Sequence, residues 1–141
     1  MKNKRKLFVI VAALSVTVVA AAFVIPNTMN NYLCKKCSTL IKSQSQPSAL
    51  GCPQGGSHQW SRLGEVGRKY YHCHKCNILV ESASQPSALG CPSQSSHQWH
   101  YLGQLGDKNY QCRKCGTYVH TESQPSSLGC GAGGSHQWHK L

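Results

Sequence analysis

Nine cysteines and three histidines recur in one fixed order, and their side chains are the strongest candidates for chemistry in this chain. Each set reads C-x2-C-x14-C-x5-H and starts 39 residues after the previous one. Thiolate sulfur and imidazole nitrogen suit Zn²⁺, and three cysteines with one histidine form a usual closed structural zinc site. The sequence therefore predicts three metal sites and three Zn²⁺ per chain. The expected ligands are Cys34, Cys37, Cys52 and His58, then Cys73, Cys76, Cys91 and His97, and finally Cys112, Cys115, Cys130 and His136.

Each ligand set could begin either at a C-x2-C pair or at the preceding histidine, and the number of cysteines left outside a set decides between the two. His58 also precedes the second C-x2-C pair, so it could form a set with Cys73, Cys76 and Cys91. That choice would leave Cys34, Cys37 and Cys52 at one end of the chain, and His136 at the other, outside any complete set of four ligands. Starting each set at its C-x2-C pair uses all nine cysteines, so we adopt that phase.

A disulfide framework is the main alternative, because small secreted modules often depend on one. Three cysteines per repeat would leave one unpaired or force bridges between repeats, and the recurring histidine would have no role. A thioredoxin-like redox function for C-x2-C requires a βαβ context that this chain lacks. The ligand types alone leave open whether the ion is zinc or iron.

The elements that position these ligands must be short, because each repeat spans only 32 residues. A unit below about 40 residues seldom buries enough apolar surface to fold without a metal, disulfides or association. We therefore expect tandem small β modules stabilised by metal. Module 1 covers residues 32–63, module 2 covers 71–102 and module 3 covers 110–141, with connectors at 64–70 and 103–109.

Each module shows the same order of local signals. A short strand ends at the first cysteine, and a β-leaning run (39–42, 78–81 or 117–120) follows the C-x2-C turn. A loop rich in Ser, Gln and Pro leads to the third cysteine, and the module ends on Ser-His-Gln-Trp. Two glycines in each connector suggest a hairpin turn. We therefore expect the strand at Trp60 to pair with the strand at Tyr71 of the next module.

The tryptophans follow each ligand histidine by two residues, so we expect them to cover the metal sites. In module 2 the expected small core contains Trp99, Tyr71, Val80, Leu89 and Leu102.

Five further histidines lie outside the ligand sets. Three occur in one copy only, and two follow a tryptophan, so surface positions are expected for all five. They are His72, His74, His100, His120 and His139.

The segment Cys112-Arg-Lys-Cys115-Gly116 resembles the first knuckle of the zinc-ribbon and rubredoxin-like zinc-knuckle class, and the match extends over residues 32–141. The resemblance implies a zinc-ribbon-like fold for each module. The second knuckle is Cys-x5-His instead of a second C-x2-C, which counts against a four-cysteine iron site. The class performs many unrelated functions, so the resemblance assigns none.

Residues 1–26 have the composition of a membrane anchor or signal segment. A basic run, 1–6, precedes residues 7–25, which carry no charge. An apolar run of about 17–25 residues can span a bilayer as a helix, which favours an anchor; the alternative is a signal peptide cleaved near Ala20-Ala21-Ala22. The basic flank should stay cytoplasmic. The modules would then be extracytoplasmic, anchored or, after cleavage, secreted, with residues 27–31 as a spacer.

The net charge of +11 gives little support for a polyanionic partner. Four of the basic residues lie in the first six positions, which leaves +7, and three metal sites of charge −1 each would leave +4. Such a mild excess is a weak sign of nucleic-acid binding. We therefore rank a nucleic-acid-binding array as an alternative only.

The acidic residues do not form a catalytic pattern. Glu65, Glu81, Asp107 and Glu122 are the only four, and none recurs with the ligand sets as a general base would. A saturated Cys3His site also lacks an open position for water. The sequence predicts a non-enzymatic protein that binds an unidentified protein or surface partner, with metal buffering or thiol sensing as a further alternative.

Overall fold

The computed structural model describes residues 27–93 and 95–141, and this part of the chain contains strands and turns without a helix. No helix there is long and apolar enough to span a membrane. The candidate anchor at 7–25 lies outside the described residues. The strands are β1 (Asn30–Cys34), β2 (Leu40–Ser43), β3 (Trp60–Glu65), β4 (Lys69–Cys73), β5 (Leu79–Ser82), β6 (Trp99–Cys112), β7 (Tyr118–Thr121) and β8 (Trp138–Lys140).

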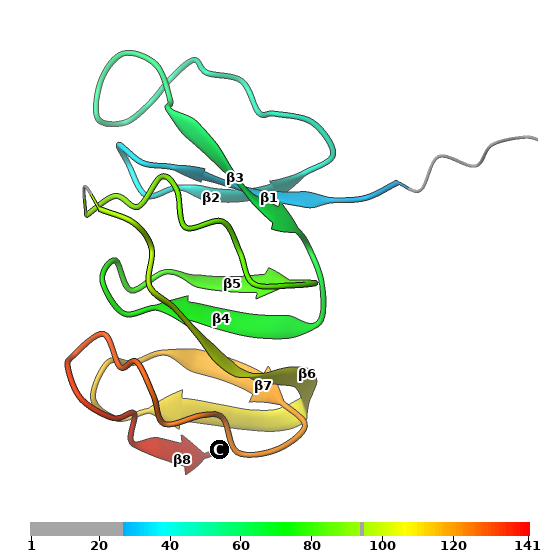
Figure 1. Ribbon diagram of the computed structural model, residues 1–141, viewed down its shortest axis with the longest axis vertical. Coiled ribbons are helices and arrows are strands. Elements are labelled where there is room, and N and C mark those ends of the chain that lie inside the picture. Colours follow the sequence, from blue (N-terminus) through cyan, green and yellow to red (C-terminus); the bar gives the residue numbers. More distant parts are fainter. Residues whose placement is uncertain (1–26, 94) are drawn as a thin grey trace, which may run out of the picture.

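The three modules stack along the long axis of the molecule (Figure 1). Module 1 forms a three-stranded antiparallel sheet, and modules 2 and 3 share a five-stranded antiparallel sheet through β6. The β-leaning run after each C-x2-C turn forms a strand (β2, β5 or β7) whose bounds lie within one residue of the predicted range. The strands that end at the first cysteines are also confirmed, although β1 begins at Asn30, inside the segment assigned as a spacer. The small, all-β modules predicted from the repeat are therefore present.

The expected pairing between Trp60 and Tyr71 strands is wrong. β3 pairs with β1 of its own module, with Cys34 opposite Trp60, so the first sheet has the order β2-β1-β3. Glu65 and Gly64 oppose Asn30 and Asn31, so connector residues belong to the sheet instead of a hairpin turn.

The second connector departs further from a turn, because β6 runs without a break from module 2 into module 3. Its first half pairs with β4, and its second half pairs with β7 and β8. The second glycine of each connector allows another backbone segment to approach closely. A side chain at Gly67 would come within 2.3 Å of the Ala83 backbone, and one at Gly106 within 2.3 Å of the Glu122 backbone.

The apolar core lies mainly between modules. Among the described residues, one buried cluster joins module 1 to module 2, and a second joins module 2 to module 3. Burial of this kind stabilises neighbouring units jointly, as in repeat proteins. The first cluster contains Leu33, Leu63 and Val80 with Leu40, Ile78 and Trp99; the second contains Tyr70, Leu102, Tyr110 and Val119 with Leu79, Leu105 and Trp138.

Backbone hydrogen bonds repeat at both junctions. Ser87 N donates to Leu63 O at 2.7 Å, and Ser126 N donates to Leu102 O at the same distance. The Ser/Gln/Pro loops of modules 2 and 3 therefore lie in the layer between neighbouring modules, as seen for residues 83–93 in Figure 1. The expected core residue Leu89 is exposed. It lies two residues beyond the serine that makes this bond, where the loop reaches solvent.

Candidate metal centres

The structure brings all twelve predicted ligands together as three separate groups. In each group the four ligand atoms lie within 4.8 Å of one another. The first cysteine of each group ends a strand, and the second follows the turn. The third cysteine and the histidine come from the long loop that leads into the last strand. The adopted phase of the repeat is confirmed, since His58 groups with Cys34 and not with Cys73.

All nine cysteines lie in the described part of the chain, and all are free thiols. The disulfide framework is therefore absent from this structure. A simple distance test instead fits a metal. With a Zn–S bond of about 2.3 Å and a Zn–N bond of about 2.0–2.1 Å, a tetrahedral ion separates sulfur from nitrogen by about 3.5 Å. The second cysteine Sγ lies 3.5, 3.5 and 3.4 Å from the histidine Nδ1 in groups 1 to 3.

The first knuckle is built by backbone hydrogen bonds that are the same in each module. In module 1, Cys34 N donates to Thr39 O and Ser38 N donates to Cys34 O, both at 2.9 Å. The residue after the second cysteine must adopt a positive φ, which is 60° at Ser38, 59° at Asn77 and 73° at Gly116. Glycine accepts this conformation without cost, whereas a residue with a Cβ is strained there.

Backbone amides stabilise a thiolate at the first cysteine of each group. Burial raises the pKa of Cys34, but the amide of Cys37 and further hydrogen-bond donors outweigh it and lower the pKa to about 6. At Cys112 the same balance, led among the donors by the Cys115 amide, gives a pKa of about 7. The pKa of Cys73 is lowered in the same way. The first cysteine of each site therefore ionises more readily than an ordinary thiol, before any metal binds.

In each site, burial also favours the protonated form of one further cysteine. Burial raises the pKa of the Cys52 and Cys130 thiols, and it also raises that of Cys76. A metal that binds these sulfurs must displace protons, so metal affinity should fall as the pH falls.

The ligand histidines are held by the tryptophans, as the sequence predicted. Each histidine ring stacks on the tryptophan two residues later, at centroid distances of 4.6, 4.5 and 4.6 Å in modules 1 to 3. Each indole N–H is fixed in turn, since it donates to the carbonyl of Ser48, Ser87 or Ser126 at 2.8–2.9 Å. The tryptophan therefore ties the ligand histidine to the Ser/Gln/Pro loop.

A basic residue clamps the second knuckle. The Lys36 ammonium donates to Gly55 O at 2.6 Å, and that of Lys114 donates to Gly133 O at 2.5 Å. In module 2, Lys75 contacts the Ser95 hydroxyl at 3.3 Å. This position in the C-x2-C turn thus links the two knuckles, in addition to offsetting the charge of the thiolates.

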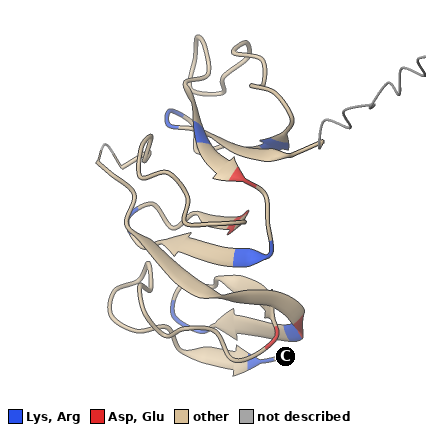
Figure 2. Cartoon of the chain, turned by 45° about the vertical axis from the view of Figure 1, so that its right-hand side comes forward, with Lys and Arg blue, Asp and Glu red and all other residues tan. Residues whose placement is uncertain are grey.

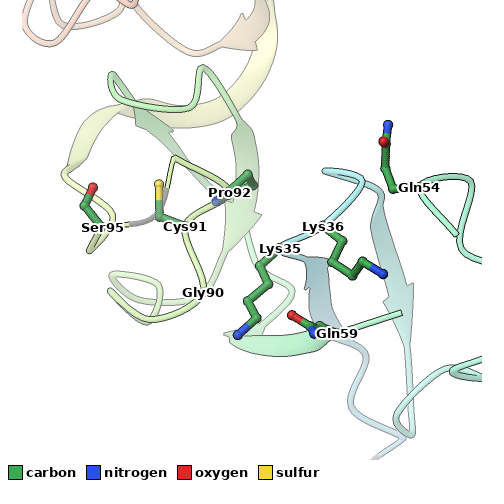
Figure 3. Close-up of a pocket in the computed structure, with 8 residues that line it drawn as sticks. All are labelled: Lys35, Lys36, Gln54, Gln59, Gly90, Cys91, Pro92 and Ser95. Carbon is green, nitrogen blue, oxygen red and sulfur yellow. The ribbon is translucent and has the colours of Figure 1, made fainter. Parts of the chain in front are cut away.

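A cavity of about 580 Å³ lies where the first knuckle of module 1 faces the second knuckle of module 2 (Figure 3). Lys35, Lys36 and Gln59 line it from module 1, and Gly90 and Cys91 from module 2. Lys and Arg positions occur along the backbone of all three modules (Figure 2).

The expectation that His72 lies on the surface is wrong. Its side chain is fully buried, with Nδ1 3.0 Å from Gly129 O and Nε2 2.8 Å from Asn77 Oδ1. The repeat offered a signal that was missed, because His72 occupies the position of Leu33, an apolar residue in a strand. His74, His100 and His139 are half-buried, and His120 is exposed as expected.

Comparison of the chain with protein-family models, curated proteins and solved structures finds no match.

Proposed function

We propose that this chain is a non-enzymatic zinc-binding repeat protein, anchored in a membrane by residues 7–25, whose three zinc-ribbon-like modules bind a protein or surface partner outside the membrane. The observation that carries the zinc assignment is the sulfur-to-nitrogen spacing of 3.4–3.5 Å, repeated in three Cys3His groups. Three thiolates and one neutral imidazole fit a closed tetrahedral zinc site. When bound, the ion supplies a structural cross-link between the two knuckles of each module.

The anchoring part of the proposal is supported by composition. The uncharged run 7–25 follows a basic N-terminal segment, which the positive-inside rule keeps in the cytoplasm. Labelling of intact cells with a membrane-impermeant amine reagent tests it. We expect label on lysines of the modules, such as Lys69 and Lys108. Label that appears on these lysines only after lysis would contradict an extracytoplasmic location.

The binding part is supported by three exposed leucines at the same loop position. Leu50, Leu89 and Leu128 are 80 %, 72 % and 63 % exposed. Each is presented by an ordered loop, since its amide donates to the hydroxyl of the serine two residues before it at 3.2–3.3 Å. Weak contacts repeated on one chain gain affinity through effective concentration.

A substitution series tests multivalent binding to the cell envelope. Leu→Ser is introduced at one, two or all three of these positions in the full chain, and retention on isolated envelope fractions is measured. Because the leucines are exposed, folding should not change. We expect retention to fall by more than one third with the first substitution. A decrease of one third per substitution would argue against avidity, and an unchanged triple variant would exclude this surface.

One observation favours metal buffering or sensing as a second candidate. His58 is half-buried, whereas its counterparts His97 and His136 are only 4 % and 5 % exposed. Module 1 would therefore exchange its ion while the more buried sites of modules 2 and 3 keep theirs. Retention of all three ions against a moderate chelator would exclude this function.

A further inference from the structure

Two histidines outside the Cys3His groups meet on module 2. The Nδ1 atom of His74 lies 3.0 Å from the Nε2 atom of His100, within hydrogen-bond distance, so a bound ion would replace the hydrogen bond between the two rings. We propose that His74 and His100 form a fourth metal site, for a divalent transition ion that accepts tetragonal geometry, such as Ni²⁺ or Cu²⁺. Solvent completes its coordination.

The nitrogen separation favours one type of ion. Two metal–nitrogen bonds of about 2.0–2.1 Å that meet at a right angle place their nitrogens about 2.9 Å apart. The same bonds at a tetrahedral angle would require about 3.3–3.4 Å. The observed 3.0 Å fits the square-planar or tetragonal case. Imidazole donors suit Ni²⁺ and Cu²⁺, which bind nitrogen ligands with high affinity.

The neighbouring module fixes the His100 ring, and the turn directly after β4 places His74 beside it. The β4–β6 register pairs Cys73 with Trp99 and His72 with His100, so His74 and His100 leave adjacent strands at one edge of the sheet. The His100 ring packs on Gly129 of module 3, where an added Cβ would come within 2.1 Å of its Cδ2. Little conformational freedom remains to be lost when an ion binds.

The surroundings leave room for solvent but supply no third imidazole. Both rings are half-buried, so water can reach the ion from the open side. His72 lies close by, but both of its ring nitrogens are already hydrogen-bonded, to Gly129 O and to Asn77 Oδ1. The site is therefore a two-histidine chelate with open positions, in contrast to the closed Cys3His sites.

The pair is a property of module 2 alone. At the equivalent positions module 1 has Lys35 and Ser61, and module 3 has Arg113 and His139. Neither combination offers two imidazoles. The repeat thus supplies a natural replacement for each histidine, and also a matched control, His139, whose partner position carries an arginine.

Equilibrium dialysis of the zinc-loaded full chain against micromolar Ni²⁺, with nickel and zinc counted by mass spectrometry, tests the proposal. We expect the chain to bind one more Ni²⁺ than the His100→Ser variant binds, with zinc unchanged in both. The His139→Ser variant should bind as much nickel as the unaltered chain. Bound nickel should show no thiolate charge-transfer absorption, because its protein ligands are nitrogens.

Two results would overturn the fourth site. The first is an equal amount of bound nickel in the unaltered chain and in the His100→Ser variant. The second is a gain of nickel in proportion to the zinc lost, because the nickel would then occupy the Cys3His groups. If the His100→Ser variant loses zinc through misfolding, the His74→Arg variant is used in its place, because module 3 has an arginine at this position. It must lose the extra nickel and keep its zinc.

Discussion

Modules 1 and 3 contain the same ligand set, but their surroundings differ. In module 3 the ligand His136 is 5 % exposed and Val119 is fully buried, because module 2 covers them. In module 1 the equivalent His58 is half-buried, and Ile41, the counterpart of Val119, is 36 % exposed. The sequence pattern builds the site, whereas the preceding module decides how far solvent reaches it.

On the opposite face of each module, which in modules 1 and 2 points to the next module along the chain, the exposure of side chains follows the reverse pattern. Leu63 and Leu102 are buried under the next module, whereas Leu141, at the same position, is 61 % exposed. Gln111 replaces the buried His72 and Leu33 on this face of module 3. Each junction therefore contributes stability that no single module has, and the following predictions test this dependence.

The largest effect should come from removing a leucine at a junction. Leu102→Ala empties part of the cluster between modules 2 and 3 and should lower the free energy of unfolding by about 2–5 kcal/mol. Leu141→Ala removes the same side chain from the uncovered face and should change it by at most about 0.5 kcal/mol. Denaturant unfolding of the zinc-loaded chain measures both. Equal losses would show that stacking does not stabilise the array.

Chelation should remove the ion of module 1 first. Since His58 is partly accessible and His97 and His136 are covered, we expect at least about a tenfold difference in release rate, which corresponds to about 1.4 kcal/mol in the barrier. Thiols freed by a chelator are alkylated at intervals and assigned by mass spectrometry. Cys34, Cys37 and Cys52 should be modified before the other six. Simultaneous modification of all nine would remove the distinction between outer and inner sites.

Acid should release the inner ions as the ligand histidines become protonated. Burial, followed by the nearby His72, lowers the pKa of His136 from 6.5 to about 4, and burial lowers that of His97. A depressed pKa in the folded chain stabilises folding above pH 6.5, and this contribution is lost as the pH falls through about 4. Bound zinc measured after dialysis from pH 7.5 to 4 should therefore decrease mainly below pH 6.5. Full retention at pH 4 would contradict the assigned histidine ligands.

The smallest effect concerns the left-handed residue of the first knuckle. Ser38→Gly should stabilise module 1 by about 1 kcal/mol, because glycine adopts its φ of 60° without strain. The reverse change, Gly116→Ser, should destabilise module 3 by a similar amount. Thermal unfolding followed by tryptophan fluorescence detects both. Equal and opposite shifts would confirm that the two knuckles share one backbone geometry.

The ligand groups were predictable because metal coordination requires donors of fixed type at fixed spacing, and the repeat showed that spacing three times. The strands that carry Cys34 and Leu40 were predictable from local β signals. The strand partners were not. The glycines at 64 and 67 indicated a turn by local rules, but Gly67 lets one backbone pass close to another, and Gly64 lies in the sheet with a φ of 133°. That requirement comes from the stacking of modules, which no single repeat contains.

Burial of individual side chains depended on the same unseen contacts. His72 and Leu33 occupy one position in the repeat, and both are buried because the next module covers them. Leu89 is apolar but faces solvent, because its loop is held by the Trp99 indole and by the Ser87 amide. The expectation for His72 rested on its occurrence in a single copy and that for Leu89 on its hydrophobicity, and both were wrong. Comparison of equivalent positions across the repeats would have identified His72.

Metal analysis of the purified full chain tests the central claim most directly, when it is combined with thiol counting and circular dichroism before and after a strong chelator. The account predicts about three zinc ions per chain, no free thiols before chelation, nine afterwards, and loss of the β structure with the metal. A metal-free chain that keeps its β structure, with its sulfurs joined in disulfides, would contradict it.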